Sequence, residues 1–140
     1  MSVKEAEWLR APLVPVILNT LYPPNQPTAR RCYELGRAVR AAIESWPEDQ
    51  RVVVVGSGGL SHFLIDEEID RRFLTALREK DTRAICELPN ARLQSGTGEI
   101  RSWIAAAAAV EDLDLAFVEY QACYRSPAGS GMGMGFAVWK

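Results

Sequence analysis

The only histidine of this 140-residue chain, His62, ends a stretch rich in glycine and serine, GSGGLSH (56–62). An imidazole titrates near neutral pH, so it can take up and release protons as a general acid or base. The alternative is a structural histidine that is held by hydrogen bonds in an ordinary tight turn. Because there is one histidine, one copy of the chain cannot complete a metal site that needs two imidazoles.

Carboxylates are the second group of candidates. Glu99 falls in the first turn of a helix predicted over residues 97–110, where its charge favours the positive end of the helix dipole. An acidic cluster predicts the capped, solvated start of another helix. It consists of Asp66, Glu67, Glu68 and Asp70. Spacing alone gives both sets a structural explanation and leaves a chemical role for Glu99 open.

Other site motifs are weak or missing. The GSGG segment could cradle a phosphate with its backbone N–H groups, but no lysine lies near it and the chain has neither GxGxxG nor GxxxxGK[ST]. The GxSxG motif of a nucleophile elbow is also missing. The cysteines Cys32, Cys86 and Cys123 are widely spaced, which predicts buried thiols rather than a disulfide framework or a zinc site.

Hydrophobic periodicity predicts the elements that must position these groups. Short β-branched or alternating runs predict strands over residues 14–18, 51–55, 113–120 and 134–139. Helical spacing predicts helices between Thr28 and Pro47, after Asp66, over 82–88 and over 97–110. This order predicts a single α/β domain, residues 1–140, with a layered, mixed and partly parallel sheet flanked by helices. Because ligands bind beyond the carboxyl ends of strands in such sheets, His62 is expected at the mouth of a site.

Composition excludes several classes of partner. The 16 lysines and arginines nearly balance 18 aspartates and glutamates, so a formal charge of -2 offers no basic footprint for nucleic acid or an anionic membrane. The apolar runs are too short to cross a bilayer, and the N-terminus lacks the apolar core of a signal peptide. We therefore expect a cytoplasmic protein.

Four segments together resemble the C-terminal half of the class III (LigB-like) extradiol ring-cleavage dioxygenases. They read LNTLYPPNQPTARRCYELG, VVVVGSGGLSHFLIDEEIDRR, LQSGTGEIRSWIAAAAA and YRSPAGSGMGMGFAVW. Their order and spacing match over residues 14–139, which is nearly the whole chain. The resemblance implies half of a LigB-like fold and cleavage of a catecholic ring beside its two hydroxyls with non-haem Fe(II) and O₂.

The resemblance also assigns roles to particular residues. It implies that Glu99, in GTGEIRSW, is the carboxylate iron ligand and that His62 is the acid/base residue near the bound substrate and oxygen. Ser126 or Ser130 is expected to contact a polar group of the substrate. Family members take both histidine ligands from their N-terminal half, so this chain alone is expected to bind iron weakly and to be inactive.

Two function classes follow from this incomplete ligand set. In the first, the chain is the catalytic portion of an extradiol dioxygenase that needs a complementary N-terminal half or a second subunit. In the second, it is a non-catalytic remnant or subunit-like binding protein that retains the fold. A sheet edge and an apolar face without their partner half predict self-association, with Trp8 or the alanine-rich helix as candidate contacts of a homo-oligomer.

Overall fold

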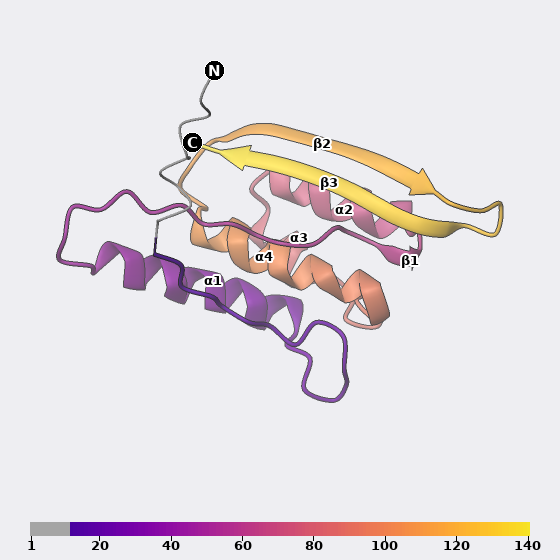
Figure 1. Ribbon diagram of the computed structural model, residues 1–140, viewed down its shortest axis with the longest axis horizontal. Helices are drawn as coiled ribbons and strands as arrows, with labels where there is room; N and C mark the ends of the chain where they lie inside the picture. The colour runs from indigo at the N-terminus through magenta and orange to yellow at the C-terminus, as the bar shows by residue number, and fades with distance from the viewer. Residues whose placement is uncertain (1–11) are drawn as a thin grey trace, which may run out of the picture.

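A three-stranded sheet lies over a layer of helices in the computed structural model of the chain, which describes residues 12–140 (Figure 1). The strands are β1 (His62–Leu64), β2 (Leu115–Tyr124) and β3 (Ser130–Trp139), in the order β1-β3-β2. Both pairings are antiparallel, with His62 opposite Met132 and Tyr120 opposite Gly135. The predicted α/β class is confirmed, but the described strands include no parallel pair.

Helices form where periodicity and capping residues predicted them. They are α1 (Ala29–Glu44), α2 (Glu67–Arg78), α3 (Thr82–Cys86) and α4 (Ile100–Ala109), with the 3₁₀ helix η2 (Ser95–Glu99) directly before α4. The side chain of Thr28 caps α1 by accepting a hydrogen bond from the Arg31 backbone N–H at 3.2 Å. Asp66 caps α2 in the same way, accepting from the Ile69 N–H at 3.2 Å. The helix predicted over 97–110 is thus divided, and Glu99 lies at the junction.

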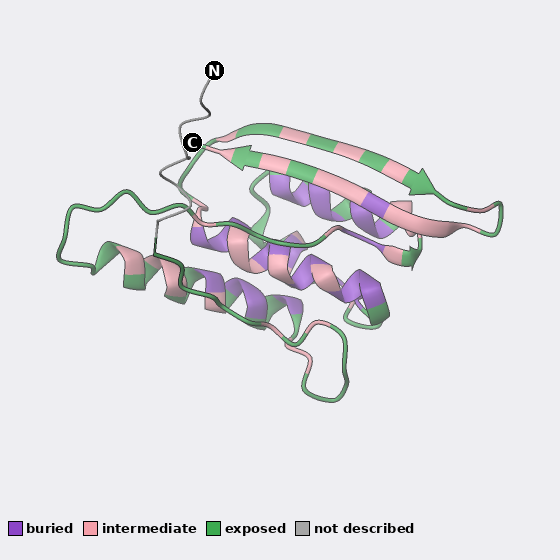
Figure 2. Cartoon of the chain, in the orientation of Figure 1, coloured by how far each residue is buried: buried purple, intermediate pink, exposed green. Residues whose placement is uncertain are grey.

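The alanine-rich helix α4 packs closely against α1. A Cβ placed on Gly36 of α1 would lie 2.2 Å from the Ala105 carbonyl oxygen, so only glycine permits this approach. Buried residues gather in α2, α4 and the N-terminal half of α1 (Figure 2). Ala107 to Ala109 are buried, so this part of α4 is interior and is not a free contact surface. Trp8, the other predicted contact, lies outside the described residues.

Glycines alternate along the face of β3 that looks toward the helices. A Cβ on Gly133 would lie 2.2 Å from Asp70 Oδ2, and one on Gly135 would lie 3.1 Å from Leu60. The strand therefore presents bare backbone to α2 and to the loop before β1, which pack directly on it. The opposite face carries larger side chains, and Phe136 and Val138 are more than half exposed there.

Two predicted strands do not form within the described residues. Residues 14–18 and 51–55 are non-helical segments with no ladder partner, although their β-branched composition led us to predict strands there. Val53 and Val55 are 76% and 80% exposed, whereas a strand covered on both faces would bury them. The prediction was wrong because a strand is defined by its neighbour, and no described segment provides one.

The three cysteines differ in their burial. Cys32 is buried, but Cys86 is half-buried and Cys123 is exposed, so the expectation of three buried thiols was wrong. Burial raises the pKa of the Cys32 thiol to about 11, an effect that the nearby Arg101 charge partly offsets. Among residues 12–140, no helix combines the length and apolar character that crossing a membrane requires.

Candidate active site

His62 and Glu99 lie side by side at one end of the molecule. His62 begins β1, and Glu99 ends η2 just before α4. Its carboxylate oxygen Oε2 lies 3.6 Å from His62 Nε2. The structure therefore brings together the acid/base candidate and the ligand candidate, which come from separate segments of the chain. Figure 1 shows β1, the start of α4 and the β2–β3 turn at the same end of the fold.

The glycines of the GSGG loop permit this approach. Gly58 has φ +103°, and a Cβ there would lie 2.3 Å from Glu99 Oε2. A Cβ on Gly59 would lie 2.5 Å from His62 Nε2. The Gly59 N–H donates a hydrogen bond of 3.1 Å to Glu99 Oε2. The loop N–H that might have cradled a phosphate thus holds a carboxylate of the chain itself, which weakens the phosphate-binding alternative.

The imidazole of His62 is largely enclosed but not satisfied. Its side chain is 18% exposed and that of Glu99 is 36% exposed. The Nε2 atom is buried and has no hydrogen-bond partner among residues 12–140. The backbone of η2 packs closely from one side, since a Cβ on Gly96 would lie 2.4 Å from His62 Cβ. A purely structural histidine would normally have its buried nitrogens paired, so this geometry favours a chemical role.

A buried carboxylate that sequence reasoning missed lies beneath the loop. Asp70 is fully buried and accepts hydrogen bonds from the Ser61 N–H (2.9 Å), the Ser61 hydroxyl (2.6 Å) and the Tyr120 hydroxyl (2.8 Å). Burial raises the pKa of Asp70, although these hydrogen bonds act in the opposite direction. The acidic cluster is therefore not wholly a solvated helix start. Asp70 fixes Ser61, the residue before His62.

The spacing of apolar residues in α2 could have predicted that Asp70 is buried. It is spaced three, four and seven residues before Phe73, Leu74 and Leu77, so it belongs to the apolar stripe of α2. All three of these residues are buried. A buried carboxylate on such a stripe needs hydrogen-bond donors, and Ser61 of GSGGLSH and Tyr120 of β2 provide them.

The buried Arg101 side chain hydrogen bonds to the loop before α1 and to the loop before η2. Its guanidinium donates to the carbonyl oxygens of Pro27 at 2.6 Å, Leu93 at 2.5 Å and Thr20 at 3.3 Å. Burial lowers the pKa of Arg101, and its side chain is 1% exposed as part of the core. The backbones meet nearby as well, because a Cβ on Gly98 would lie 2.0 Å from the Thr20 oxygen. These contacts fix the start of α4, and with it Glu99.

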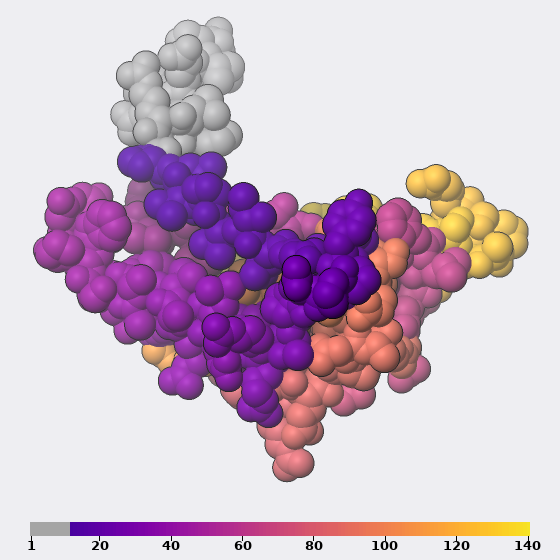
Figure 3. Space-filling view, turned by 90° about the horizontal axis from the view of Figure 1, so that it is seen from below, coloured from indigo at the N-terminus to yellow at the C-terminus, as the bar shows by residue number. Residues whose placement is uncertain are grey.

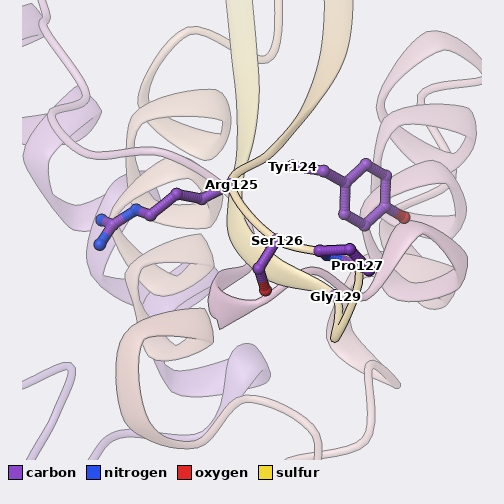
Figure 4. Close-up of a pocket in the computed structure, with 5 residues that line it drawn as sticks. All are labelled: Tyr124, Arg125, Ser126, Pro127 and Gly129. Carbon is purple, nitrogen blue, oxygen red and sulfur yellow. The ribbon is translucent and has the colours of Figure 1, made fainter.

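Of the predicted substrate-contacting serines, Ser126 lies in the β2–β3 turn and Ser130 begins β3. The Ser126 and Ser130 hydroxyls are 2.7 Å apart and hydrogen bond to each other. Ser130 pairs with Leu64, two register positions from the pairing of His62 with Met132. Ser126 also lines an open depression of about 440 Å³, together with Arg125 and Tyr124, which point to opposite sides of the turn (Figure 4). The serines lie near the candidate site, and their contact with substrate stays a prediction.

The described residues do not fit a complete iron centre. A facial triad uses two histidines and one carboxylate. Within residues 12–140, no group of three or more histidine, cysteine, aspartate or glutamate side chains lies close enough together to hold a metal ion. Glu99 and the unpartnered His62 nitrogen supply one carboxylate and one imidazole.

Comparison with known proteins gives this geometry a context. The family model described as the catalytic LigB subunit of aromatic ring-opening dioxygenase matches residues 5–135. The chain belongs to the LigB family. A gallate dioxygenase from Pseudomonas putida is 39% identical over 66% of this chain. The 2,3-dihydroxyphenylpropionate/2,3-dihydroxicinnamic acid 1,2-dioxygenases of Photorhabdus laumondii and Xanthobacter autotrophicus are 49% and 45% identical, each over 38% of the chain.

The chain spans only part of these LigB-family relatives. The matched stretch is 30% of the gallate dioxygenase and 16% of each of the other two proteins. The chain therefore spans less than a third of the length of these relatives.

Proposed function

We propose that this chain forms part of the active site of a non-haem Fe(II) extradiol dioxygenase that cleaves catecholic aromatic rings with O₂. Glu99 is the carboxylate ligand in this proposal, and His62 is the acid/base residue. The observation that carries it is the proximity of His62 Nε2 and Glu99 Oε2, 3.6 Å apart beside the GSGG loop, in a chain of the LigB family.

The contacts of Glu99 and His62 are compatible with the roles proposed for them. The Gly59 N–H orients the Glu99 carboxylate, and the loop backbone packs directly against it because Gly58 has no side chain. A catechol hydroxyl that reaches His62 can give its proton to Nε2, which has no competing partner in the described chain. When bound, Fe(II) supplies coordination of the catecholic oxygens and of O₂.

A second polypeptide completes the site in this proposal. The two further imidazole ligands come from a complementary N-terminal half or a second subunit, because this chain has only His62. The 140-residue chain alone is then inactive and holds iron weakly.

Co-expression tests the proposal directly. The chain is produced with the part of the Pseudomonas putida gallate dioxygenase that lies outside the matched stretch, and oxygen uptake is measured with gallate and other catechols. We expect iron-dependent uptake with the pair, and a loss on the order of 100-fold or more in Glu99→Ala and His62→Ala.

Glu79→Ala is the matched control, because Glu79 is an exposed carboxylate at the end of α2, remote in sequence from both site residues. Equal activity of the Glu99→Ala pair and the unmodified pair would show that the ligand assignment is wrong. No activity in the unmodified pair would count against the enzyme proposal as a whole.

A non-catalytic remnant is the second candidate. The observation in its favour is that the described residues contain no three-donor cluster. In this case a pair that forms a stable complex binds no iron and takes up no oxygen. Iron content of the purified complex, measured beside oxygen uptake, separates the two candidates.

A further inference from the structure

The segment that leads into the GSGG loop has unpaired backbone groups. None of the N–H or C=O groups of residues 51–57 hydrogen bonds to another backbone group of the described chain. The next residue, Gly58, offers its carbonyl to the Trp103 indole N–H at 3.0 Å. Backbone groups that lack internal partners remain available to a neighbouring chain. We call residues 51–57 the valine segment.

One face of the valine segment rests on α4, and the other is free. A Cβ on Gly56 would lie 2.8 Å from Ala106 Cβ, so the segment touches the helix there. Val54 is half-buried, whereas Val53 and Val55 are mostly exposed. This alternation is that of a strand with one face covered and the other exposed.

The N-terminal part of the described chain has the same character. Residues 12–18 have no ladder partner, and Leu13, Val14 and Ile17 are 86%, 79% and 89% exposed. Figure 3 shows this segment, in indigo, lying on the molecular surface. Both exposed apolar segments thus have strand-like composition and no strand neighbour among residues 12–140.

We propose that the valine segment is the docking site for a β-strand of a separate polypeptide, the one that corresponds to the unmatched part of the LigB-family relatives. This inference rests on the proposed function, because it names the surface through which the complementary portion joins the site. Recognition is by strand addition, in which main-chain hydrogen bonds hold the partner and apolar side chains cover Val53 and Val55.

The valine segment leads directly into the candidate site, and this position favours the complementary polypeptide as its binding partner. The valine segment runs into Gly58 and Gly59, which touch Glu99 and His62. A strand paired along it therefore ends beside these two side chains and can bring ligands to them. The matched stretch covers only 30% of the gallate dioxygenase, so most of the length of that relative lies outside the match. A second copy of the chain is disfavoured, since it carries no imidazole besides its own His62.

Amide hydrogen exchange measures the proposed pairing. The 140-residue chain is compared alone and in an equimolar mixture with the unmatched portion of the Pseudomonas putida gallate dioxygenase, at the same chain concentration. We expect exchange of alternate amides within residues 52–57, those on the paired edge, to slow by roughly tenfold or more in the mixture, because strand pairing protects the N–H groups that face the partner. Complex formation is followed in parallel by sedimentation.

Proline substitutions locate the edge that binds. Successive N–H groups of a strand point to opposite edges, so Val53→Pro and Val54→Pro each remove a donor from a different edge. Neither substitution removes a backbone hydrogen bond formed within residues 12–140, so both variants are expected to fold. One of them should weaken the complex by roughly tenfold or more, whereas Val53→Thr, which keeps the N–H, should bind far better.

Three other outcomes would overturn the proposal, and a fourth bears on the proposed function instead. Protection of residues 52–57 in the chain alone that grows with its concentration identifies a second copy as the occupant. A complex without protection of these amides shows that the interface lies elsewhere. If no complex forms, the proposed partner does not bind the chain. A protected complex without iron or oxygen uptake leaves the docking surface intact and counts against the proposed enzyme function instead.

Discussion

Replacing Asp70 tests whether the buried carboxylate holds the loop that carries His62. In Asp70→Ala, the Ser61 N–H and the Ser61 hydroxyl, both fully buried, lose their acceptor, and so does the partly exposed Tyr120 hydroxyl. A buried polar group left without a partner costs about 1–3 kcal/mol. Since the Tyr120 hydroxyl can turn toward water, we expect the free energy of unfolding to fall by about 3 kcal/mol.

The Asp70→Asn variant separates the effect of side-chain size from the effect of charge. It keeps the size of the side chain and one acceptor oxygen, so we expect a smaller loss of about 1 kcal/mol. The pKa of Asp70 is raised by burial above its ordinary value of 3.8, so the folded state binds the proton more tightly than the unfolded state does. The Asp70 contribution to stability therefore declines as pH rises from about 3.8 through the raised pKa.

The assay is urea unfolding across this pH range. Stability of the unmodified chain relative to Asp70→Asn should decrease as pH increases, because the variant lacks the titrating group. Asp49→Asn, at an exposed loop position, is the matched control and should parallel the unmodified chain. Identical pH profiles for Asp70→Asn and the unmodified chain, or an Asp70→Ala variant of unchanged stability, would refute the reasoning.

Two further predictions concern the glycine loop and self-association. Gly58→Ala places a methyl group 2.3 Å from the Glu99 carboxylate at φ +103°, so it should cost about 1–3 kcal/mol of stability and lower oxygen uptake of the completed enzyme. Gly129→Ala is its control, because φ is +83° there but nothing lies within 4 Å, so only the stability should fall. The outer face of the sheet exposes 55% of Phe136 and 52% of Val138, so the isolated chain should self-associate in sedimentation experiments. Phe136→Ser should shift it toward monomer, and a monodisperse monomer at high concentration would contradict this prediction.

Local features of the fold could be predicted from sequence because local contacts determine them. Thr28 and Asp66 cap their helices as predicted, since a cap needs only the backbone three residues ahead. Residues 51–55 were predicted as a strand, but strand formation depends on a distant partner that the described chain does not supply. The antiparallel direction of the sheet also depends on distant pairings, such as that of β1 with β3.

The candidate site was predictable only in part. The resemblance selected His62 and Glu99, and their proximity in the structure depends on a loop of glycines whose purpose no spacing rule reveals. The role of Asp70 was missed because its acidic neighbours favoured a solvated helix start. Its burial follows from its position on the apolar stripe, once Ser61 and Tyr120 are known to face it.

The bare face of β3 has a consequence for how this region tolerates change. At Gly133 and Gly135, side chains of neighbouring segments rest directly on the peptide planes of the strand. An added methyl group at Gly133 would press on the Asp70 carboxylate, which three hydrogen bonds hold in place, whereas at Gly135 the Leu60 and Trp103 side chains would need to shift by only a few tenths of an ångström. We therefore expect sequence change to be slower at Gly133 than at the exposed Phe136.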